Sequence, residues 1–159
     1  MRTPGTRGAR RLTAAAAAVL ALGLAPSAAS AKQSVTLHFE KDCPVLTCKG
    51  SLISPAGKPV RGSSVETEVT PLWPGDNLLH YSAVETITAR HGTIKMQLLG
   101  ILDFRAEPDI TYVMGTVESG AWRGRSLAGA SITAVATRAF GTTFRGVIHL
   151  RPASVQAEA

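Results

Sequence analysis

The sequence predicts an all-β protein, an eight-stranded antiparallel up-and-down barrel, with a β-sandwich as the alternative. After residue 31 the chain shows no convincing apolar stripe with the 3.6-residue period of a helix. Short segments rich in β-branched and apolar residues recur there instead. The links between these segments are short and contain Gly, Pro or Asp, as hairpin turns do, so neighbouring strands should run antiparallel.

Eight segments have the composition of strands. They span approximately residues 34–40, 49–54, 63–72, 79–90, 93–104, 109–117, 127–139 and 142–151. Closure into a barrel removes the exposed edges of long strands. A sandwich of the immunoglobulin type would use two cysteines far apart in the sequence, whereas Cys43 and Cys48 are close together. The barrel is therefore the preferred architecture.

The first 31 residues have the three-part order of a secretory signal peptide. A basic start is followed by an apolar run over residues 13–25 and by small residues that end at Ala31, the expected cleavage site. The apolar run is shorter than the roughly 20 residues that cross a bilayer. We therefore expect a secreted, extracellular protein without stable membrane insertion after cleavage. Arg10 and Arg11 leave both the Sec and the twin-arginine export routes open.

The remaining chain is expected to form one domain over residues 32–151 and a flexible C-terminal tail over residues 152–159. The whole chain has a net charge of +6, but four of its arginines lie in the first 31 residues, which contain no acidic residue. The rest holds 13 Lys and Arg against 11 Asp and Glu, a balance of only +2. Without basic residues interleaved with aromatic ones, nucleic acid is not an expected partner.

Cys43 and Cys48 are the only cysteines, and we expect them to form a disulfide in an oxidising compartment. The competing interpretation is a metal site, but a single pair of cysteines without a second Cys or His pair is a weak zinc pattern. Phosphate-binding loops, dinucleotide fingerprints and metal-binding histidine motifs are all missing from the sequence. We therefore expect neither a metal nor a cofactor.

One hairpin can be aligned by hand, because His91-Gly92 has the composition of a two-residue turn that would pair Arg90 with Thr93. The face predicted to point inward then carries alternate residues of two strands: Leu79, Tyr81, Ala83, Glu85, Ile87 and Ala89 opposite Phe104, Leu102, Gly100, Leu98, Met96 and Ile94. Met96, Leu98, Leu102 and Phe104 are the expected binding residues on this face. An eight-stranded barrel is just wide enough to hold one small ligand or to be filled by side chains.

Glu85 is the unusual member of this apolar face. A buried carboxylate must find a partner, take up a proton or sit beside trapped water, and such groups often mark functional sites. Tyr81 is the second residue before Glu85 on the same face of the strand, and these two are the candidate catalytic residues. Two plainer interpretations stay open: a β-bulge that turns Glu85 outward, or a wet barrel mouth where the charge costs little.

Two tryptophans are further candidates for ligand contact. Trp73 lies in a Pro- and Gly-rich loop after the third segment, where it is expected to cover the core or to act as a lid over a cavity. Trp122 stands beside Arg123 and Arg125. It is expected to close one barrel end as an aromatic plug with two solvated arginines, the alternative being an anion-receptive or partner-binding tip.

Residues 114–130 (MGTVESGAWRGRSLAGA) and 141–150 (GTTFRGVIHL) resemble the C-terminal half of allene oxide cyclase-like and dirigent-like barrels. In those families a strand leads through a Gly-rich turn and an aromatic residue into a long strand and a final hairpin. The stretch Glu118-Ser119-Gly120 departs from the usual turn of these families. The resemblance implies a calycin-like barrel with a hydrophobic cavity, no cofactor, and assembly into trimers or dimers.

Two functions of different classes follow from these observations. The preferred one is an exported binding module whose barrel holds a small apolar molecule or a partner, because catalytic motifs are missing and the inner face is apolar. The alternative is a cofactor-free isomerase or cyclase in which Glu85 and Tyr81 supply acid-base or electrostatic help to an apolar substrate. A filled barrel with a structural role would exclude both.

Overall fold

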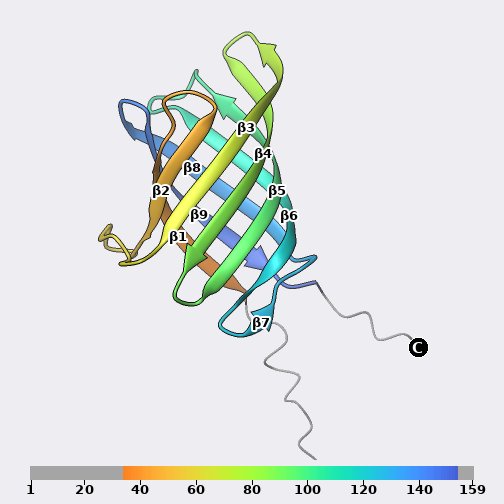
Figure 1. Ribbon diagram of the computed structural model, residues 1–159. Coiled ribbons are helices and arrows are strands. Elements are labelled where there is room, and N and C mark those ends of the chain that lie inside the picture. The colour runs from red at the N-terminus through yellow and green to blue at the C-terminus, as the bar shows by residue number, and fades with distance from the viewer. Residues whose placement is uncertain (1–33, 154–159) are drawn as a thin grey trace, which may run out of the picture.

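The computed structural model describes residues 34–153, and within this range the chain folds into a closed antiparallel β-barrel (Figure 1). The strands are β1 (Val35–Asp42), β2 (Thr47–Ile53), β3 (Ser64–Gly75), β4 (Leu78–Ala89), β5 (Gly92–Asp103), β6 (Ile110–Trp122), β7 (Arg125–Ser126), β8 (Ser131–Phe140) and β9 (Thr143–Arg151). The expected signal peptide, residues 1–31, and most of the expected tail, from residue 154 on, lie outside the described residues.

Eight of these strands form the barrel wall in the order β5-β4-β3-β2-β1-β9-β8-β6, and β6 returns to pair with β5. The pairing of β1 with β9 joins the first and last strands of the wall. All neighbours are antiparallel, so the predicted up-and-down barrel is confirmed and the sandwich alternative is wrong. The two-residue strand β7 is an addition that the sequence did not predict; it pairs with the end of β6.

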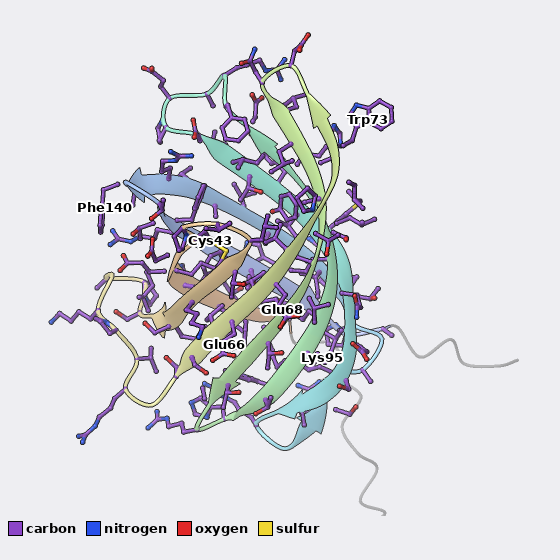
Figure 2. The ribbon with its side chains drawn as sticks, turned by 45° about the horizontal axis from the view of Figure 1, so that its top comes forward. Cys43, Glu66, Glu68, Trp73, Lys95 and Phe140 are labelled. Carbon is purple, nitrogen blue, oxygen red and sulfur yellow. A yellow bond between two sulfur atoms is a disulfide. The ribbon has the colours of Figure 1, made fainter. Side chains whose placement is uncertain are left out.

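Strict alternation of side chains separates the inside of the barrel from the outside. In β8, for example, Ile132, Ala134 and Ala136 are buried and the residues between them are exposed. In β3, Glu66 and Glu68 point outward, as Figure 2 shows, whereas Val65 and Thr67 are buried. Because the pattern has a period of two, each strand presents one apolar side to a common interior.

The register of the β4–β5 hairpin differs from the prediction by two residues. Ala89 pairs with Gly92, so Arg90-His91 forms the turn, and Glu85 lies opposite Met96 and not opposite Leu98. Gly92 has a φ of 137°, and a Cβ atom there would lie 2.1 Å from the carbonyl oxygen of Ala121. This glycine therefore belongs to the strand, where it permits a close approach of β6. A shift of two keeps every side chain on its predicted face.

The two ends of the barrel differ in how they are filled. At the lower end in Figure 1, which we call the closed end, large side chains of the core pack together: Val65, Ile87, Ile94, Val117, Trp122, Leu127 and Leu150. Trp122 is only 6% exposed, and its ring centroid lies 5.7 Å from that of His91. Trp122 therefore closes this end of the barrel; of the two arginines beside it, Arg123 is exposed and Arg125 is half-buried.

The residues from 34 to 153 include no helix of the length and hydropathy that a membrane span requires. Within the same range, no group of three potential metal-ligating His, Cys, Asp or Glu side chains is found.

Candidate ligand cavity

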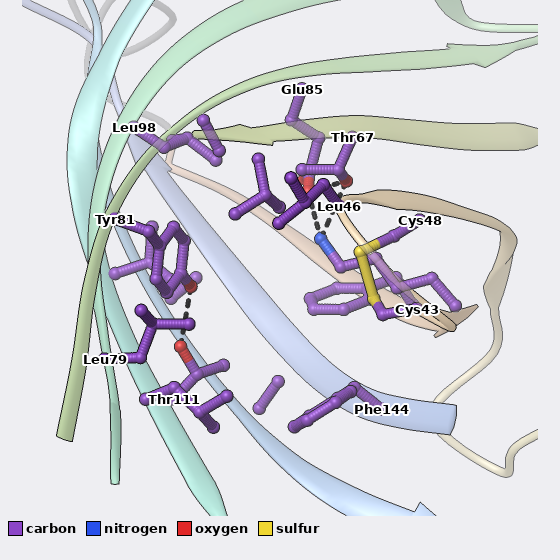
Figure 3. A pocket seen from close by; sticks show the side chains of 18 of the residues that line it. Cys43, Leu46, Cys48, Thr67, Leu79, Tyr81, Glu85, Leu98, Thr111 and Phe144 are labelled. Atoms are coloured by element: carbon purple, nitrogen blue, oxygen red, sulfur yellow. Dashed lines mark hydrogen bonds and ion pairs between the residues drawn. A yellow bond between two sulfur atoms is a disulfide. The ribbon is translucent and has the colours of Figure 1, made fainter. Parts of the chain in front are cut away.

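A cavity of about 320 Å³ occupies the other end of the barrel, which we call the open end. Its wall is formed by the inward side chains of the β-strands, and the β1–β2 loop, residues 43–46, lies at its mouth (Figure 3). Val45 in this loop lines the cavity and is 79% exposed, so the cavity reaches the protein surface there. The volume lies at the lower end of the range of typical small-molecule sites.

The cavity exists because several inward positions near the open end carry small side chains. Ala83, Ala134 and Ala136 line it from β4 and β8, and all three are buried. Gly100 lies beneath the ring of Tyr81, since a Cβ atom on Gly100 would be 2.2 Å from that ring. An eight-stranded barrel that carried larger residues at these positions would be filled by its own side chains.

The disulfide between Cys43 and Cys48 closes the β1–β2 loop at the cavity mouth, as Figure 3 shows. The amide of Cys43 donates to the carbonyl of Thr142 at 3.0 Å, and the amide of Val69 donates to the carbonyl of Leu46 at 2.7 Å. Both cysteines line the cavity. The predicted disulfide therefore fixes one side of the cavity entrance against β3 and the β8–β9 turn.

A polar cluster lies deep in the cavity and consists of Lys41, Thr67 and Glu85. Lys41 Nζ forms an ion pair with Glu85 Oε2 and donates to Thr67 Oγ1 at 2.9 Å. Thr67 Oγ1 donates to the same carboxylate oxygen at 2.8 Å. Lys41 Nζ also lies 4.9 Å from the ring centroid of Phe39. The carboxylate of Glu85 is therefore stabilised by a charged partner, the first of the three possibilities named for a buried carboxylate.

Glu85 itself is only 1% exposed, so the two plainer interpretations of this residue, an outward bulge and a wet mouth, are wrong. All contacts of the carboxylate use Oε2. The second oxygen, Oε1, is buried and has no hydrogen-bond partner among the described residues. An acceptor left unpaired in such a place destabilises the protein by about 1–3 kcal/mol, or more when it is charged.

Tyr81 lies nearer to the cavity mouth than Glu85 on the same face of β4. Its hydroxyl shares a 2.6 Å hydrogen bond with Thr111 Oγ1, shown as a dashed line in Figure 3. Burial raises the pKa of the Tyr81 phenol above its ordinary value; the hydrogen bond with Thr111 opposes this, and the charge of Glu85 adds to it. Tyr81 is therefore a neutral hydrogen-bonding group at physiological pH.

Arg138 is a third polar feature of the cavity and comes from the end of β8. One of its terminal nitrogens, Nη2, binds Asp109 at 2.7 Å, and its guanidinium carbon lies 5.5 Å from the ring centroid of Phe144. Its Nε is buried and has no hydrogen-bond partner within the described range. Two residues that line the cavity thus carry a buried polar atom without a partner in this range, a donor in Arg138 and an acceptor in Glu85.

The structure brings together six of the eight residues that the sequence predicted for catalysis or binding. Glu85, Tyr81, Met96, Leu98, Leu102 and Phe104 all line the cavity. The two tryptophans do not. Trp122 lies in the closed end, and Trp73 is 70% exposed and points away from the barrel in Figure 2. Core cover by Trp73 is therefore wrong, because β3 continues past a bulge at Pro71/Trp73 into a projecting hairpin.

Sequence reasoning missed Lys41 and Arg138, the two cationic residues of the cavity. A signal for Lys41 exists, because it continues the alternation of the buried residues Leu37 and Phe39 along β1. Its pairing with Glu85 has no local signal, since two strands, β2 and β3, separate β1 from β4 in the sheet order. Arg138 likewise follows Ala134 and Ala136 on the inward side of β8.

Comparison of the chain with protein-family models, with curated proteins and with solved structures finds no match in any of the three. The closed barrel that the resemblance implied is present. Membership of an allene oxide cyclase-like or dirigent-like family stays a prediction from residues 114–130 and 141–150.

Proposed function

We propose that this protein binds a small, largely apolar molecule in the cavity at the open end of the barrel. The observation that carries the proposal is a surface-connected cavity of about 320 Å³ with a mostly hydrophobic wall in a barrel whose other end is solid. At the volume that water occupies in the liquid, this space corresponds to about ten water molecules. The cavity is therefore large enough for a ligand of about ten non-hydrogen atoms.

A matched pair of variants on β8 tests this function. Ala134 lines the cavity, whereas its neighbour Thr133 is exposed on the outer face. Titration with the apolar fluorophore aminoanthracene is expected to show saturable binding to the wild-type protein and to Thr133→Phe. Ala134→Phe places a ring inside the cavity and is expected to abolish that binding. Equal dye affinity in the two variants would contradict the proposal.

The natural ligand is best identified from protein isolated from its own host. Mass spectrometry of an organic extract is expected to detect the same apolar compound with the wild-type protein and with Thr133→Phe, and to lose it with Ala134→Phe. A compound retained equally by all three proteins would lie outside the cavity.

We further propose that the protein acts outside the cytoplasm after removal of residues 1–31. The disulfide between Cys43 and Cys48 supports this, because such bonds persist mainly in oxidising compartments. N-terminal sequencing of the protein secreted by its host should begin at Lys32. A mature protein that starts at Met1 would contradict export by a cleaved signal peptide.

A cofactor-free isomerase or cyclase of the allene oxide cyclase-like type is the second candidate function. It is favoured by the position of Glu85 and Tyr81 in the wall of one cavity. Under this hypothesis, Glu85→Gln abolishes conversion of an apolar substrate and leaves the affinity for aminoanthracene nearly unchanged. If the compound extracted from the host is released chemically unchanged after incubation with the wild-type protein, binding alone is the function.

A further inference from the structure

The two buried side-chain atoms that lack hydrogen-bond partners in residues 34–153 belong to residues of the same cavity. They are Glu85 Oε1 and Arg138 Nε. Native proteins pair nearly all buried polar atoms, and the exceptions often mark positions where another molecule supplies the partner. Both atoms belong to residues that line a largely apolar cavity, so a small shift of either side chain would offer its polar atom to a ligand.

The oxygen of Glu85 calls for a hydrogen-bond donor. The carboxylate is held by Lys41 and Thr67 through Oε2 and accepts nothing at Oε1. Oε1 has almost no surface of its own, so a ligand donor reaches it after a rotation of the carboxylate, and the terminal torsion of a glutamate is soft. A hydroxyl group at the deep end of the ligand meets this requirement.

The nitrogen of Arg138 calls for the opposite chemistry. Nε–H is a donor only, and the ion pair with Asp109 uses another nitrogen of the guanidinium group. A carbonyl or ester oxygen is the simplest partner for it. The side chain of Arg138 is 39% exposed, whereas that of Glu85 is only 2% exposed. The hydroxyl group therefore belongs to the buried part of the ligand and the carbonyl oxygen to the part nearer to solvent.

The charges of the cavity are already balanced. Lys41 is paired with Glu85, and Arg138 is paired with Asp109. A ligand with a carboxylate or ammonium group would bring an additional charge into an apolar site, where an unpaired charge is strongly unfavourable. The ligand is consequently expected to be uncharged.

We propose that the cavity binds an uncharged molecule with an apolar body, a hydroxyl group that donates to Glu85 and a carbonyl oxygen that accepts from Arg138. This inference rests on the proposed binding function and specifies its ligand class. The methyl ester of ω-hydroxyoctanoic acid is a suitable probe, because it has both groups and about a dozen non-hydrogen atoms, close to the size of the cavity.

The first test compares ligands on the unmodified protein, by displacement of aminoanthracene. The hydroxy ester is expected to bind about tenfold more tightly than methyl octanoate, which lacks the hydroxyl group, as befits one hydrogen bond to a charged acceptor. The ω-methoxy ester, which has only an acceptor at that end, should bind more weakly still. The free hydroxy acid should bind at least about tenfold more weakly than its methyl ester, because it is charged.

The second test changes the acceptor. In Glu85→Gln, the amide oxygen keeps the contacts with Lys41 and Thr67, and the amide nitrogen places a donor at the position of Oε1. The preference for the hydroxy ester over the methoxy ester is then expected to disappear. Glu66→Gln, on the exposed face of β3, should retain the wild-type preference. Should Glu85→Gln fail to fold, the ligand series on the wild-type protein still decides the question.

The third test concerns Arg138 and uses Arg145 as its control, since both arginines pair with a carboxylate but only Arg138 lines the cavity. Arg138→Met should weaken binding of the hydroxy ester several-fold more than that of octanol, because octanol has no carbonyl group. Arg145→Met should affect neither ligand.

The outcomes separate this inference from the proposed function. If neither aminoanthracene nor any ester binds, the binding function itself is wrong. If the dye and methyl octanoate bind but the hydroxy ester has no advantage, or if the free acid binds best, the binding function stands and the proposed ligand class is overturned.

Discussion

The closed and open ends of the barrel are built from the same strands with the same alternation, yet one is solid and the other is hollow. In β4, for example, the inward residue Ile87 fills space toward the closed end, whereas the inward residue Ala83 leaves space toward the open end. In β8, Ala134 and Ala136 leave space near the mouth. The size of individual inward side chains, not the architecture of the barrel, therefore decides where a cavity forms.

The largest difference between the ends is expected from the two tryptophans. Trp122→Ala opens a hole in the closed end and should lower the free energy of unfolding by about 3–5 kcal/mol. Trp73→Ala removes a side chain that is 70% exposed and should change it by less than about 0.5 kcal/mol. Urea denaturation with the disulfide intact measures both. Similar losses in the two variants would show that the closed end is not the packed core.

The next effect concerns the charged cluster of the open end. Lys41→Met leaves Glu85 buried without its cation and is expected to destabilise the protein by about 3–5 kcal/mol at neutral pH. Lys95→Met removes an exposed ion pair with Glu118 and should cost at most about 1 kcal/mol. The denaturant midpoints of the two variants measure this difference. If Lys41→Met is as mild as Lys95→Met, Glu85 does not depend on this partner.

The same alanine-to-valine change is expected to have smaller effects of opposite sign at the two ends of the barrel. Ala134→Val adds two methyl groups beside the cavity and should stabilise the protein by about 0.5–1 kcal/mol. Ala130→Val makes the same change in the packed closed end, where Ala130 is fully buried, and should destabilise it by about 1–3 kcal/mol. Thermal unfolding of the two variants shows whether each change in stability is positive or negative. Destabilisation by both substitutions would mean that the cavity wall is as tightly packed as the core.

The smallest expected effect is a pH dependence at Tyr81. Because burial holds the pKa of its phenol above the ordinary value of 10.0, the folded protein keeps this proton while the unfolded chain loses it. Stability should therefore fall as the pH rises above about 10. Tyr81→Phe should cost about 1 kcal/mol at neutral pH, through the lost Thr111 hydrogen bond, and flatten the alkaline decline. Tyr112→Phe, at an exposed position, is the control and should keep the wild-type pH profile.

Much of the candidate site was predictable because strand alternation is a local property. The inward face of β4 and β5, including Glu85, Tyr81 and Met96, follows from residues within one hairpin. The predicted register of that hairpin was wrong by two residues, but the assignment of side chains to faces was still correct, since the pattern repeats every two residues. The prediction placed the turn at His91-Gly92 because glycine is common in turns. Gly92 instead lies in β5, where any side chain would collide with the backbone of Ala121 on β6. No feature of the hairpin itself reveals this contact.

Local sequence was enough to identify the strand segments, the apolar side of the β4–β5 hairpin and the carboxylate that stands among its apolar residues. All of these depend on residues close together in the chain. The folded barrel was needed to see that Lys41 pairs with Glu85, that Arg138 lines the cavity and that the space beside Ala83 and Ala134 stays open. These features depend on distances across a closed barrel, which are set jointly by strand order, register and the volumes of side chains far apart in sequence.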